Sequence, residues 1–124
     1  MSDVAGIGIS TGSPVVIYLH EPKEKMWGLL VSVAPSGLCL RGMDIRVFDD
    51  WMRQESRDDE RMIGAATIFF PMHRVERVEL DETVGPLTSY EDRFVDYVGR
   101  PVAESLGWVV PGGKRGRRRP PGSK

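Results

Sequence analysis

Residues 14–42 read PVVIYLHEPKEKMWGLLVSVAPSGLCLRG, and this stretch decides the fold. It contains three runs rich in apolar and β-branched residues, which are separated by the turn signals PKEK at 22–25 and PSG at 35–37. Short apolar runs bounded by Pro and Gly are typical of β-strands that follow one another in a meander. The sequence therefore predicts three strands, at residues 14–21, 26–34 and 38–42. Gly28, inside the second run, predicts a sharp bend or a bulge in that strand.

The apolar period changes after this meander. Asp44 is a candidate N-cap for a helix that extends to residue 54 or 55, with Phe48, Trp51 and Met52 on one stripe. Two further strands are predicted at residues 66–70 and 73–81. In the second of them, Val78 and Leu80 share a face while Val75 falls on the other, which indicates a curved strand. Thr88 and Glu91 have the spacing of a capping box and predict a second helix, ended by Gly99 and Pro101.

These elements indicate a mainly β fold: a small, strongly bent five-stranded barrel with a helical insertion at 45–61 and a C-terminal helix at 88–99. The 124 residues fit one domain. We expect residues 1–13 to form a flexible arm, residues 14–104 to form the barrel domain, and residues 105–124 to form a disordered basic tail.

The order of elements resembles the Sm and Hfq family of small barrels, whose bent sheet is SH3-like. The resemblance covers residues 14–82 and is carried by three segments: Trp27-Gly28-Leu29-Leu30, Leu38-Cys39-Leu40-Arg41-Gly42, and Phe69-Phe70-Pro71-Met72-His73-Arg74-Val75. It implies that the fourth and fifth strands pair between subunits to form rings that bind RNA. His73 and Val75 match the Hfq junction, where Met72 replaces a Lys. Ala34 and Gly37 replace the Asp and Asn that serve uridine binding in Sm proteins.

Charge is divided unevenly along the chain. Residues 114–124 carry six basic residues and no acid, whereas residues 1–113 carry 11 basic and 18 acidic residues, a net charge of −7. A basic run of this kind neutralises phosphates without reading their sequence. The sequence therefore predicts a nucleic-acid contact through the tail, assisted by three residues of the barrel. The predicted contact residues are Arg41, His73, Arg74, Lys114, Arg115, Arg117, Arg118 and Arg119.

Other functional classes find little support in the sequence. The two histidines, His20 and His73, have no spacing that ties them to a nucleophile or to metal ligands, and Cys39 is the single cysteine. We therefore expect a non-enzymatic protein with no cofactor, no metal and no small-molecule substrate. No segment approaches the ~18 apolar residues of a membrane span, and no signal peptide is evident, which favours a cytoplasmic location without membrane contact.

Two main hypotheses from different classes remain open at this stage, beside a third option of an enzyme subunit whose chemistry resides in a partner chain. The first is a self-associating, Sm-like protein, a homo-oligomer that contacts RNA through its basic tail. The second is a structural or adaptor module that binds another protein through a sheet edge or through the Trp51 stripe. The acidic body favours the second hypothesis, because a ring would concentrate negative charge around its pore.

Overall fold

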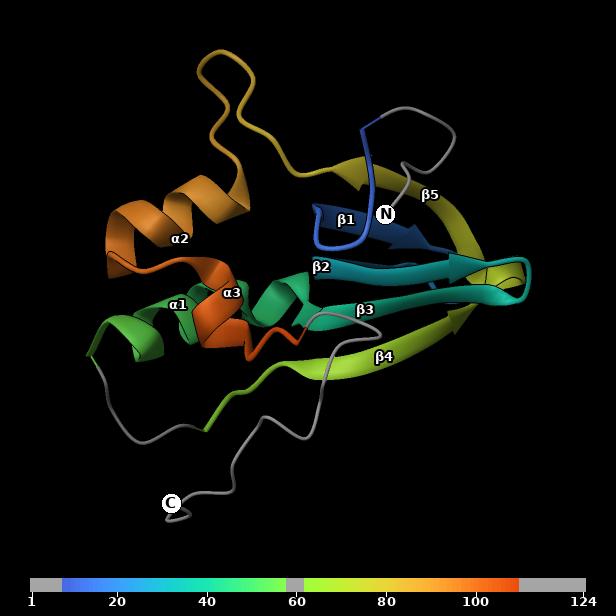
Figure 1. Cartoon of the computed structure of the whole chain (residues 1–124), viewed down its shortest axis with the longest axis horizontal. Helices are drawn as coiled ribbons and strands as arrows, with labels where there is room; N and C mark the ends of the chain where they lie inside the picture. Colours follow the sequence, from blue (N-terminus) through green and yellow to red (C-terminus); the bar gives the residue numbers. More distant parts are fainter. Residues whose placement is uncertain (1–7, 58–61, 110–124) are drawn as a thin grey trace.

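The structure is a computed structural model that describes residues 8–57 and 62–109. Its strands are β1 (Pro14–Leu19), β2 (Glu24–Ala34), β3 (Gly37–Asp44), β4 (Ala66–Pro71) and β5 (Val75–Leu80). Its helices are α1 (Phe48–Arg57), α2 (Tyr90–Val98) and α3 (Val102–Leu106), with short 3₁₀ helices η1 (Ile45–Val47) and η2 (Met72–Arg74). Figure 1 shows the three α-helices gathered at one end of the sheet, with the β2–β3 turn at the opposite end.

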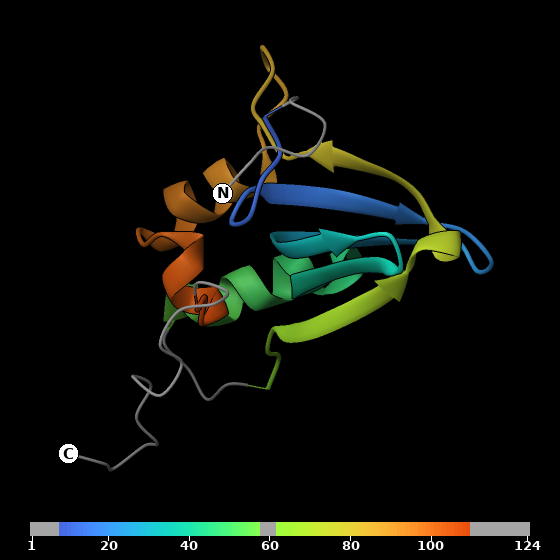
Figure 2. The ribbon, with the colours of Figure 1, turned by 45° about the vertical axis from the view of Figure 1, so that its right-hand side comes forward.

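The five strands form one antiparallel sheet in the order β4-β3-β2-β1-β5. The prediction of a mainly β fold with five strands is confirmed. The sheet is not closed into a barrel, because β4 and β5 lie at its two edges and do not pair with each other. Figure 2 shows the curved sheet with β5 and β4 on either side of the other strands.

The inner face of the sheet encloses one apolar core to which every strand contributes. Phe70 of the edge strand β4 belongs to the same cluster as Leu19, Leu30 and Leu40 from the middle strands. The residues of the other edge strand, β5, that pack against this cluster are Val75, Val78 and Leu80. The sheet is therefore bent strongly enough for its two edge strands to share one core.

The outer face packs against the helices through a cluster of aromatic rings. Trp27 of β2 lies edge-on to Phe48, with ring centroids 5.0 Å apart, and Trp51 stacks on Phe94 of α2 at 4.7 Å. All four side chains are at most 1% exposed. The predicted stripe of Phe48, Trp51 and Met52 therefore packs the helix onto the sheet within one chain, which is the simpler of the two roles considered for it.

A pair of glycines allows a close approach of the β2 and β3 backbones. Gly28 and Gly42 are direct partners in the antiparallel register. A Cβ atom at Gly42 would lie 2.0 Å from the carbonyl oxygen of Trp27 and 2.7 Å from the Cα of Gly28. No side chain fits there, so the two backbones approach closely only because both residues are glycine. The expected distortion at Gly28 coincides with this close approach, and the register shift in β2 falls later, between Leu30 and Ser32.

Several predicted details need correction. Glu24 and Lys25 begin β2 instead of forming the turn. The N-cap of α2 is Ser89 and not Thr88, since the Ser89 hydroxyl accepts from the Asp92 backbone N–H. Val75 packs on the same core as Val78 because a register shift between Tyr18 and Leu19 of β1 restores its face. The expected N-cap role of Asp44 and the stop at Gly99 are confirmed, although Asp44 caps η1.

The folded part of the chain extends beyond the predicted boundaries at residues 14 and 104. Ile9 is 5% exposed and belongs to the inner core, and the Gly12 backbone N–H donates to the Leu30 carbonyl. At the other end Leu106 is 1% exposed and Trp108 packs against the outer core. Ile9, Leu106 and Trp108 therefore belong to the folded domain, although the composition of their segments predicts a flexible arm and a disordered tail. Among the described residues, no helix is both long and apolar enough to cross a membrane.

Candidate interaction surfaces

Arg41, the first predicted contact residue, connects the sheet to helix α3. It lies on β3 opposite Thr67 of β4, and its Nε donates to the Leu106 carbonyl at 2.6 Å. Its Nη1 also donates to the Thr67 hydroxyl at 3.3 Å. The guanidinium is therefore held in place by the fold on the outer side of the sheet, where α3 packs.

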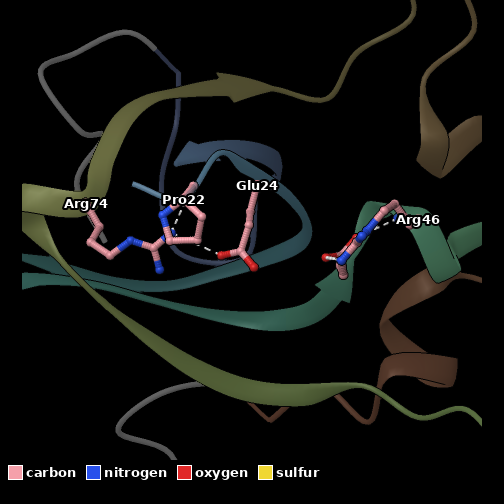
Figure 3. A network of polar contacts seen from close by, with 5 residues as sticks. Pro22, Glu24, Arg46 and Arg74 are labelled. Atoms are coloured by element: carbon pink, nitrogen blue, oxygen red, sulfur yellow. Dashed lines mark hydrogen bonds and ion pairs between the residues drawn. The ribbon is translucent and has the colours of Figure 1, made fainter. Parts of the chain in front are cut away.

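Arg74, in η2, holds the β1–β2 turn. Its Nε donates to the His20 carbonyl at 3.2 Å. One Nη donates to the Pro22 carbonyl at 2.7 Å and to the Glu24 carboxylate at 3.1 Å (Figure 3). In the same view, Arg46 forms an ion pair at 2.9 Å with the carboxylate of Asp44. Arg74 thus joins η2 to the turn that precedes β2, and its guanidinium is largely occupied by these oxygens.

The structure does not bring all the predicted barrel residues together. His73 is exposed and adjacent to Arg74 in η2. Arg41 pairs with Thr67, whereas η2 follows Pro71 at the far end of β4. At roughly 3.3 Å per residue, a strand separates these positions by more than ~10 Å. His73 and Arg74 are therefore neighbours, and Arg41 lies on a different part of the sheet.

The predicted residues of the tail lie outside the described part of the chain. They are Lys114, Arg115, Arg117, Arg118 and Arg119.

The described residues carry 10 lysines and arginines against 14 aspartates and glutamates, a net charge of −4. Six of their arginines form ion pairs with carboxylates of the same chain: Arg46, Arg53, Arg74, Arg77, Arg93 and Arg100. An arginine next to a carboxylate is a weaker partner for a phosphate, because the two anions compete for the same donors. The described surface is thus acidic, with its positive charges largely neutralised in place.

Sequence reasoning missed Asp81, a carboxylate that organises the junction between the sheet and α2. It follows β5, is 8% exposed, and accepts from the Trp27 indole N–H at 3.0 Å. It also accepts from the backbone N–H groups of Tyr90 and Glu91, at 3.0 and 2.9 Å. A negative charge at a helix N-terminus satisfies unpaired donors and interacts favourably with the helix dipole. Partial burial, together with the nearby charges of Asp81 and Asp92, raises the pKa of Glu91.

We expect Asp81→Ala to destabilise the fold by about 2 kcal/mol, because the buried Trp27 indole N–H and two partly buried backbone N–H groups lose a charged acceptor. Asp96→Ala is the matched control, since Asp96 lies on the exposed side of the same helix. Urea unfolding followed by tryptophan fluorescence measures both variants. A loss for Asp81→Ala no larger than that of the control would show that this carboxylate does not hold α2 against the sheet.

A second buried carboxylate, Glu55, lies at the C-terminal end of α1. It is 3% exposed, and one Nη of Arg100 lies 3.3 Å from its carboxylate and 3.1 Å from its backbone carbonyl. The two side chains line a depression of about 480 Å³ together with Arg41 and Ser105. Oppositely charged groups line this depression in pairs, so no net charge within it selects a cation or an anion. Among residues 8–57 and 62–109, no group of three His, Cys, Asp or Glu side chains is arranged to hold a metal ion.

The two edges of the sheet differ in chemistry. The edge strand β4 lies in a stretch, residues 62–72, that has no charged side chain, and its Phe69 is 55% exposed. The other edge strand, β5, carries Glu76, Arg77 and Glu79, all of them exposed. Charged side chains on an edge strand discourage pairing with another chain, and an uncharged edge permits it. The β4 edge is therefore the better candidate for an interaction surface.

Comparisons of this chain with protein-family models, with curated proteins and with solved structures found no match.

Proposed function

We propose that this chain is a non-enzymatic, self-associating module of the Sm-like kind, with an open and strongly bent sheet, which contacts RNA through its basic C-terminal tail. The shape of the sheet supports the self-association part of the proposal. The sheet is bent so that β4 and β5 pack on one core, and the outer side of each of these edge strands pairs with no other strand of the sheet. Such edges pair readily with strands of other chains. A domain of this size buries only about two thirds of its unfolded surface, so pairing between copies would add to its stability.

The RNA part of the proposal is supported by the distribution of charge. The described residues have a net charge of −4, and the segment 114–124 carries six basic residues without an acid. Electrostatic interactions are screened over about 8 Å at physiological ionic strength. A basic segment farther than this from the acidic body can therefore attract phosphates independently of it.

The direct test compares the full chain with a chain that ends at Gly113. Binding to a single-stranded RNA is measured by fluorescence anisotropy over a series of salt concentrations. We expect the full chain to bind with an affinity that falls steeply with salt, and the shortened chain to lose at least tenfold in affinity at low salt. The matched control keeps the length and replaces the arginines of the tail by serine: Arg115→Ser, Arg117→Ser, Arg118→Ser and Arg119→Ser.

Equal binding by the full chain and by both variants would show that the tail has no role in RNA contact. Absence of binding by the full chain at low salt would remove RNA from the proposal altogether. The second candidate function, a protein-binding adaptor, is favoured by the six arginines that are already ion-paired within the acidic body. It predicts that the chain self-associates or binds protein and ignores RNA at every salt concentration.

A further inference from the structure

The backbone of β4 indicates which of its groups are directed away from β3. The Met72 backbone N–H donates to the Ser36 carbonyl at 3.0 Å, which fixes the phase of hydrogen bonding between β3 and β4. In an antiparallel pair, hydrogen-bonded and non-hydrogen-bonded residue pairs alternate. Phe70 and Ile68 therefore direct their backbone groups toward β3, whereas those of Thr67 and Phe69 are directed toward the outer edge.

We propose that β4 pairs antiparallel with β4 of a second copy around a two-fold axis, with Ile68 opposite Ile68 of that copy. This inference rests on the self-association proposed above and specifies the surface and the symmetry. It replaces the ring pairing of β4 with β5 that the Sm and Hfq resemblance implies by a closed pairing of β4 with β4. A two-fold axis perpendicular to the sheet keeps the faces of both copies aligned. Paired residues must then have side chains on the same face, so only registers in steps of two residues are allowed.

The register centred on Ile68 satisfies the outward backbone groups best. It places Thr67 of one copy opposite Phe69 of the other, so that the N–H and C=O groups of both residues find partners. A register centred on Phe69 would place Thr67 opposite Pro71, which has no N–H to donate. A register centred on Thr67 would move Phe69 opposite Ala65, beyond the end of the strand.

Electrostatics favour a second copy of β4 as the partner over β5. Two copies of the chain carry the same net negative charge on their described residues, so they repel each other over most of the surface. Residues 62–72 carry no charge, and pairing them therefore brings no like charges together. The alternative partner strand, β5, carries Glu76, Arg77 and Glu79, and pairing with it would remove water from these charged side chains. Pairing β4 with β4 also covers the exposed ring of Phe69, which lies 55% exposed on the outer face. An isologous contact of this kind closes with two copies.

A disulfide trap tests the proposed pairing. In a Cys39→Ser background, Ile68→Cys places one cysteine at the axis, in a non-hydrogen-bonded pair with Cα atoms roughly 4.5 Å apart, which a disulfide can bridge. We expect Ile68→Cys to form a covalent dimer of twice 13.9 kDa under mild oxidation, seen by non-reducing electrophoresis and by intact mass. The matched control is Val78→Cys in the same background, a partly buried position on the other edge strand. It should remain uncrosslinked.

A charge on the same edge gives a second test that requires no crosslink. In the proposed dimer, Phe69→Lys places the lysines of the two copies near each other across the two-fold axis. Because these like charges repel, we expect the dimer dissociation constant to rise at least tenfold in sedimentation velocity. Leu87→Lys is the matched control, because Leu87 is 73% exposed and belongs to the segment between β5 and α2, which lies on the opposite side of the sheet from β4 (Figure 1).

The outcomes separate this inference from the proposed function. If the chain associates but Ile68→Cys stays uncrosslinked and Phe69→Lys has no effect, β4 pairing is wrong while self-association stands. A crosslink that forms only when Ile68→Cys and Val78→Cys are present together would also overturn the inference, because it indicates pairing of β4 with β5. If the unmodified chain is monomeric at all concentrations, both proposals fail.

Discussion

Gly42→Ala should destabilise the domain by about 3 kcal/mol, and the variant should unfold at a much lower urea concentration than the parent. The added methyl group would lie 2.0 Å from the Trp27 carbonyl oxygen and 2.7 Å from the Gly28 Cα. Both atoms belong to the backbone of the neighbouring strand, so no side-chain rotation can relieve the contact. The two strands must separate, which disrupts the pairing of β2 with β3 in the middle of the sheet.

Gly64→Ala is the control for this prediction, because a Cβ at Gly64 would meet nothing within 4 Å. It should leave stability unchanged or slightly raised, since alanine lowers the entropy of the unfolded chain. Equilibrium urea unfolding by circular dichroism compares the two variants with the parent. Equal stability for Gly42→Ala and Gly64→Ala would mean that β2 and β3 do not approach as closely as described.

Trp51→Ala should have an effect of similar size, about 3–5 kcal/mol, because it empties the centre of the outer core. The Trp51 ring stacks on Phe94 at 4.7 Å and lies 5.9 Å from Trp27, and the side chain is 1% exposed. This side chain connects α1 to both α2 and the sheet. Its removal leaves a cavity between three elements that cannot all collapse into it.

The appropriate comparison for Trp51→Ala is Tyr97→Ala, which removes an aromatic ring that is 55% exposed on α2. Thermal unfolding followed by near-ultraviolet circular dichroism reports on the packing of the remaining aromatic rings. We expect a large drop in the melting temperature for Trp51→Ala and a small change for Tyr97→Ala. A small change for both variants would contradict the placement of Trp51 in the core between α1, α2 and the sheet.

The strands and the main helices could be predicted because their signals are local. The apolar runs between Pro14 and Leu40, bounded by Pro and Gly, fix three strands, and the spacing of Phe48, Trp51 and Met52 fixes a helical stripe. Closure of the sheet could not be predicted, because it depends on whether β4 and β5 meet, and these strands are far from each other in the order of the sheet.

The errors arise where tertiary contacts override local patterns. Val75 breaks the alternation of β5 in the sequence, and only the register shift against β1 returns it to the core. Ser89 replaces Thr88 as the cap because Asp81, which directly follows β5, accepts from the backbone N–H groups of Tyr90 and Glu91 and fixes where α2 begins.

The candidate interaction residues were predictable in type but not in environment. Arg41 and Arg74 are basic residues beside the predicted barrel, and the sequence does not reveal that each donates to backbone carbonyls of its own chain. The signal that could have indicated the β4 edge is the absence of charge from residue 62 to residue 72, in a chain that is 28% charged. An edge strand without charged side chains permits pairing with another strand.

The mass of the full-length chain in solution is the measurement that tests self-association through the sheet edge most directly. Sedimentation velocity over a hundredfold range of concentration would give it without any label or mutation. The account predicts a species of at least twice 13.9 kDa that dissociates on dilution. A single species of 13.9 kDa at every concentration would contradict it.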